Sequence, residues 1–132
     1  MDRKARLYDA FGELIYVVAM ADGIIQKEEM VALEKILDLH PWSREIKWSF
    51  DYEVNHHPPI EYLYNKVLNF CHDYGPAPEY QELIEIIEKI AEASAGIEPQ
   101  EEKVITNFAQ ELTLRFARDL DRLELFLKRD KE

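Results

Sequence analysis

The sequence predicts a single all-α domain over residues 1–132, a helical bundle of about six helices. Apolar residues recur at spacings of three and four in several successive segments, which is the pattern of a helix with one buried face. Glycine and proline supply only ten residues, and nearly all of them fall between these segments. A chain of 132 residues can bury roughly two-thirds of the surface that its unfolded form exposes, so a single hydrophobic core is sufficient to stabilise the domain.

Two helices are expected before Pro41. The first covers about residues 7–21 and becomes apolar nearly all round in its last turns, which predicts a central position in the fold. Gly23 is expected to end it, because glycine readily adopts the left-handed conformation of a helix C-terminus. The second helix is expected from Lys27 to about His40, and Pro41 cannot continue it.

A helical insert is expected over about residues 43–74. Its first helix begins at Ser43, whose hydroxyl group can accept a hydrogen bond from the free amides of a helix start. The segment His56–Pro59 contains two prolines and breaks the helix. The second helix carries an apolar stripe over residues 60–71, and the segment Gly75–Pro78 is the clearest turn in the chain.

Two more helices are expected after this turn. The apolar pattern resumes at Tyr80 and continues until Gly96 interrupts it. Pro99 then occupies a position that the first turn of a helix tolerates. A long C-terminal helix is expected over about residues 99–127.

The two ends of the chain carry the same pattern when the sequence is aligned with itself so that Gly23 meets Gly96. The same alignment pairs Ile24 with Ile97 and Glu28–Glu29 with Glu101–Glu102. This predicts two helical hairpins, over about residues 5–40 and 78–113, that are related by a pseudo-twofold axis and close one core. The insert at 43–74 is expected to cover the flank of this core.

The repeated turn gathers carboxylates that could hold a metal ion. Asp22 lies at the end of one expected helix, and Glu28 and Glu29 lie in the first turn of the next. Ca²⁺ and Mg²⁺ prefer oxygen ligands of this kind, together with backbone carbonyls and water. Asp22, Glu28 and Glu29 are therefore the candidate ligands for one divalent cation, with Glu101 and Glu102 in the equivalent positions of the second turn.

At these residues the chain resembles a known family. The pattern Ala-Asp-Gly followed after five residues by Glu, at residues 21–29 and again in altered form at 94–102, looks like that of the tellurite-resistance TerB-like family, which includes a domain of some DnaJ-like co-chaperones. The resemblance covers roughly residues 5–115 and implies an all-helical bundle whose acidic turns bind a divalent metal. The second turn departs from the pattern, because Ala95 replaces the expected aspartate.

A purely structural role for the same residues is the alternative. Carboxylates at a helix N-terminus offset its unpaired amides and its positive end, by about 0.3–1 kcal/mol each. An aspartate such as Asp22 can hydrogen-bond to the backbone of its own turn. The second turn keeps its glycine and glutamates without the aspartate, as a structural motif would. The turn is no EF-hand, since Leu33 stands where such a loop requires a glutamate.

Charge and hydropathy limit the classes of partner. The formal net charge is −11, which disfavours binding to nucleic acid. Cys71 is the only cysteine, so no internal disulfide is possible. The longest apolar run, Leu14–Ala21, is far shorter than the roughly 20 residues of a membrane-spanning helix. We therefore expect a cytoplasmic protein without membrane insertion, and peripheral association stays open.

These observations predict a non-enzymatic, TerB-like binding module. It would present an acidic surface to a protein partner and hold one divalent ion, Ca²⁺ or Mg²⁺, at the first turn, in a role linked to tellurite or metal stress. No residue pattern indicates a catalytic site or an organic cofactor. The alternative is a structural domain without ligand that self-associates as a homodimer through Leu120, Leu123 and Leu127, on a final helix that extends past the core.

Overall fold

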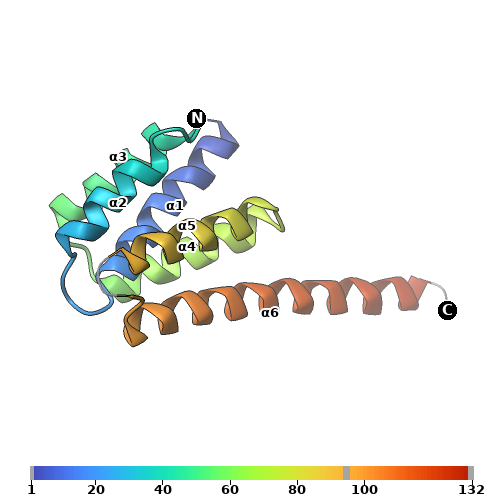
Figure 1. Ribbon diagram of the computed structural model, residues 1–132. Coiled ribbons are helices and arrows are strands. Elements are labelled where there is room, and N and C mark those ends of the chain that lie inside the picture. Colours follow the sequence, from blue (N-terminus) through green and yellow to red (C-terminus); the bar gives the residue numbers. More distant parts are fainter. Residues whose placement is uncertain (1, 94–95, 131–132) are drawn as a thin grey trace.

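The computed structural model describes residues 2–93 and 96–130, and within these ranges it contains helices and no strand (Figure 1). The prediction of an all-α bundle is confirmed. The helices are α1 (Arg3–Ala19), α2 (Lys27–Leu37), α3 (Ser43–His56), α4 (Ile60–Tyr74), α5 (Glu79–Glu92) and α6 (Pro99–Asp130). The first two end earlier than expected, α1 before Gly23 is reached and α2 before His40.

Helix α1 forms the centre of the bundle. Twelve of its 17 residues are buried, so it is covered on nearly every side. It approaches α3 most closely, then α4, and it also contacts α5 and α6. The close contact with α3 is possible because Gly12 has no side chain, and the Ser49 hydroxyl of α3 donates a hydrogen bond of 2.6 Å to the Asp9 carbonyl. The helices of the insert therefore build the core, whereas the sequence predicted only that they cover its flank.

The second helix of each expected hairpin packs across the first helix of the other. The backbone of α2 lies against α5, and the backbone of α6 lies against α1 and α4. Leu33 and Leu37 of α2 and Ile105 and Phe108 of α6 all belong to the same apolar core. In this arrangement the turn before α2 and the turn before α6 lie at the same end of the bundle (Figure 1).

The C-terminal half of α6 extends beyond the bundle (Figure 1). Leu112 is the last buried residue of this helix among those whose side chains the structure describes, although the helix continues to Asp130. Two contacts with α4 hold it just after that point: Arg115 donates a 2.7 Å hydrogen bond to Asn69, and His72 lies 2.8 Å from Asp119. None of the helices in the described part combines the length and the apolar character needed to cross a bilayer.

Candidate functional site

The first turn places its acidic residues in three different environments. The Asp22 side chain is exposed and accepts a 3.2 Å hydrogen bond from the backbone N–H of Ile24, as the structural interpretation predicts. Glu28 is exposed. Glu29 is buried, and its Oε1 atom accepts a 3.0 Å hydrogen bond from the backbone N–H of Gln26. The sequence grouped these three carboxylates, but only Glu29 points into the fold.

The second turn repeats the arrangement of the buried glutamate. The Oε1 atom of Glu101 accepts a hydrogen bond of 3.4 Å from the backbone N–H of Glu98, and Glu102 is exposed. Ala95, which stands in place of the expected aspartate, lies outside the described residues. The φ angle is near 95° at Gly96 and near 92° at Gly23. Residues other than glycine rarely adopt these positive values.

The buried glutamates of the two turns meet. Glu29 is 3% exposed and Glu101 is 1% exposed, and their carboxyl groups line the same small space, close enough for each to shift the pKa of the other. Apolar residues of α1 and α5 surround them, among them Ile15, Val18 and Ile87, and the space between leaves no volume for a water molecule. No N–H or O–H group of the described residues donates to the Oε2 atom of either glutamate.

A shared proton accounts for this geometry. Burial raises the pKa of Glu101 to about 7, and the hydrogen bond to Glu29 and the charge of Glu29 act in the same direction. Burial also raises the pKa of Glu29, although the Gln26 N–H and the bond to Glu101 oppose the shift. Two carboxylates in contact cannot both ionise cheaply, so one proton between them gives both free oxygens a partner. Below about pH 7 the pair therefore holds a proton.

The set of predicted metal ligands is only partly assembled. Of Asp22, Glu28, Glu29, Glu101 and Glu102, the structure brings together Glu29 and Glu101 and leaves the other three exposed. Asp22 is close enough for its charge to raise the pKa of both buried glutamates. Among the described residues, no three side chains of the His, Cys, Asp and Glu types are grouped so that they could hold an ion.

A second candidate surface lies on α6. The exposed residues Leu120, Leu123 and Leu127 are 60%, 53% and 50% accessible, and with the half-buried Phe116 they form one stripe along the helix. We call these four residues the α6 seam. Toward the bundle the seam continues into a groove of about 320 Å³ between α5 and α6, lined by apolar residues such as Ile84, Phe108 and Ala109. Sequence spacing predicted the leucines of the seam, but the groove depends on how α5 is placed.

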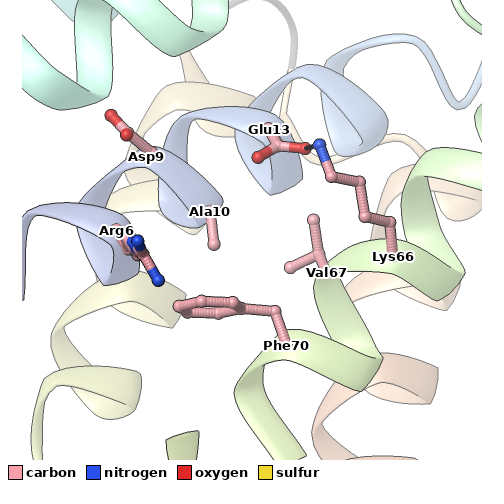
Figure 2. Close-up of a pocket in the computed structure, with 7 residues that line it drawn as sticks. All are labelled: Arg6, Asp9, Ala10, Glu13, Lys66, Val67 and Phe70. Atoms are coloured by element: carbon pink, nitrogen blue, oxygen red, sulfur yellow. Dashed lines mark ion pairs between the residues drawn. The ribbon is translucent and has the colours of Figure 1, made fainter. Parts of the chain in front are cut away.

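A small pocket between α1 and α4 is a further hollow with charged walls (Figure 2). Lys66 of α4 reaches Glu13 of α1 at 3.0 Å, whereas Asp9 points away from this pair. Burial and the charge of Glu13 raise the pKa of Asp9, which Lys66 opposes. The pocket measures about 180 Å³, and ligand sites usually measure roughly 300–1,000 Å³. It is therefore better explained as a packing defect around an ion pair than as a substrate site.

Comparisons with protein-family models, with curated proteins and with solved structures find no match to this chain.

Proposed function

We propose that this chain is a non-enzymatic binding module that recognises a protein partner through the α6 seam. The observation that carries the proposal is the projection of a regular helix beyond the core with three large apolar side chains in one exposed row. Such a row is costly to leave in water, at roughly 25 cal/mol for each Å² of apolar surface. Contiguous apolar rows on a polar helix are typical of surfaces that another helix covers.

Replacing the seam leucines tests this function. The triple variant Leu120→Gln, Leu123→Gln and Leu127→Gln should lose proteins that the wild-type chain retains in affinity purification from its native cells, because glutamine keeps the helix but removes the apolar row. The matched control is Leu114→Gln with Leu125→Gln, two exposed leucines on the opposite face of the same helix. If both variants retain the same proteins as the wild type, the seam is not the binding surface.

A divalent cation between the two turns is the second candidate, and it corresponds to what the resemblance to the TerB-like family implies. The observation that favours it is the pair of buried carboxylate oxygens, at Glu29 and Glu101, to which no group of the described residues donates a hydrogen bond. The two side chains would have to move apart to admit an ion, because the space between them has no room for a water molecule. Asp22, whose charge acts on both glutamates, is an additional carboxylate that could complete the ligands if its side chain turned inward. The role in tellurite or metal stress that the resemblance implies depends on this cation.

Calorimetric titration with Ca²⁺, Mg²⁺ and Mn²⁺ tests the cation. Because the cation must displace the shared proton, binding should strengthen above about pH 7 and should raise the melting temperature by roughly 2–4 °C at millimolar ion. Glu101→Gln should abolish the heat and Glu102→Gln should leave it unchanged. Absence of heat with all three ions at pH 8 would exclude this candidate.

A further inference from the structure

We infer that the partner of the α6 seam is the α6 groove of a second copy of this chain, in a reciprocal antiparallel dimer. The inference rests on the proposed function and names its partner. The seam and the groove lie on the same face of one helix, because Ala109, Thr113, Phe116, Leu120, Leu123 and Leu127 follow each other at spacings of four, three, four, three and four. The first three line the groove, and the seam shares Phe116 with it.

The sizes of the side chains in the two halves of this row are complementary. The part of the row inside the groove carries the small residues Ala109 and Thr113, and the projecting part carries leucines. When two copies of α6 run antiparallel about a twofold axis near residue 118, Leu127 of one copy faces Ala109 of the other. In the same register Leu123 faces Thr113, and Leu120 faces Phe116. Leu123 and Leu127 thus meet the small residues of the row on both sides of the axis, and Leu120 packs against Phe116.

A single copy cannot make these contacts by itself. The projecting residues and the groove belong to one continuous helix, so the leucines cannot fold back without breaking α6. The part beyond Leu112 is 18 residues long, or about 27 Å at 1.5 Å per residue. Helix α5, which forms the other wall of the groove, has 14 residues or about 21 Å. The two lengths therefore match to within about one turn.

The distribution of charge favours a second copy of this chain, rather than an arbitrary acidic protein, as the partner that fills the groove. Helix α5 carries five glutamates and one lysine, and Glu85 and Glu88 are exposed beside the groove. The projecting segment 115–128 is the less acidic part of the chain, with four basic and three acidic residues. Docking this segment beside α5 places a segment with a small positive net charge, rather than a second acidic helix, next to the glutamates of α5, which favours this arrangement over one that joins two α5 helices.

The dimer should be of moderate strength. A helix strip about 27 Å long and about 10 Å wide, used twice, is smaller than the roughly 800 Å² per partner of a standard interface. We therefore expect a dissociation constant in the micromolar range, about 1–100 µM. Sedimentation velocity of the purified chain from about 5 to about 500 µM should show a reversible monomer–dimer equilibrium. Leu123→Gln should weaken it at least tenfold, and Leu125→Gln should leave it unchanged.

Cysteine pairing tests the antiparallel register. An oxidised mixture of Ala109→Cys and Leu127→Cys chains should give a mixed disulfide dimer, whereas Ala109→Cys alone should not link to itself. The native Cys71 is fully buried, and burial raises the pKa of its thiol to about 12, so it should not compete. Efficient self-linking of Leu123→Cys would indicate parallel helices and would overturn the proposed register.

The same measurements separate failure of this inference from failure of the proposed function. A chain that stays monomeric up to about 500 µM overturns the dimer. If the triple seam variant then still loses proteins that the wild type retains, the seam binds a different protein and the proposed function survives. If the purified chain is monomeric and the variant loses nothing, both are wrong.

Discussion

Replacing Gly12 by alanine is expected to destabilise the fold by roughly 3 kcal/mol, enough to unfold a large fraction of a marginally stable domain. A Cβ atom at this position would lie 2.3 Å from the Ile46 carbonyl oxygen and 2.8 Å from the Ser49 Cβ atom. The nearest obstacle is backbone, so a side-chain rotation cannot relieve it and α3 must move away from α1. That movement would also stretch the hydrogen bond from Ser49 to the Asp9 carbonyl.

The sign of this effect is informative because helix propensity acts in the opposite direction. Inside an exposed helix, alanine is more favourable than glycine by about 1 kcal/mol. Chemical denaturation monitored by circular dichroism should therefore show a loss of stability only if α3 touches α1 at Gly12. Gly75→Ala is the control, since a Cβ there meets nothing within 4 Å and its cost, about 1–3 kcal/mol, comes from the backbone conformation alone, with φ 99° and ψ 175°. A stabilised Gly12→Ala variant would contradict the packing of α3 on α1.

Gly12 also illustrates which part of the fold the sequence could predict. The apolar spacing of residues 7–18 predicts a helix and its buried side, because that pattern is local. Which helix lies on that side depends on contacts that are distant in the sequence, such as those with Ile46 and Ser49. A helical pattern carries no information about its partner, so the sequence places the insert on the flank although it packs against the central helix.

The two turns are predictable only in part, for a related reason. The alignment that matches Gly23 with Gly96 also matches Glu28 with Glu101, but the buried glutamates are Glu29 and Glu101. The first turn thus has one more residue between its glycine and its buried glutamate, and an alignment without gaps misses the true correspondence. A glutamate three residues after each N-cap position, Gln26 and Glu98, is the signal that could have found it.

The stability of the folded chain is expected to fall as the pH rises from about 4.5 to about 7, by roughly 3 kcal/mol from the Glu29–Glu101 pair. Glu101 has an ordinary pKa near 4.5 when unfolded and about 7 when folded. Between these values the folded chain binds more protons than the unfolded chain, so raising the pH favours unfolding. The contribution is fully present below the lower value and is lost as the pH passes through the higher one.

Glu101→Gln should remove most of this dependence on pH and should stabilise the chain by about 1–2 kcal/mol at pH 8. The glutamine amide can donate permanently to the Glu29 carboxylate, and its carbonyl oxygen can still accept from the Glu98 N–H. The measurement is urea denaturation at pH 5, 6, 7 and 8 in the presence of a chelator, so that bound cations do not contribute.

Glu102→Gln is the matched control for this substitution, because it removes the same charge from the adjacent, exposed residue of the same turn. The net charge of −11 makes any lost carboxylate mildly stabilising at high pH, and the control measures that general effect. The difference between the two variants isolates the buried pair. Equal dependence on pH in both would mean that Glu29 and Glu101 share no proton. The bond between the two turns would then be missing, and the meeting of the turns would have to depend on the apolar contacts around it alone.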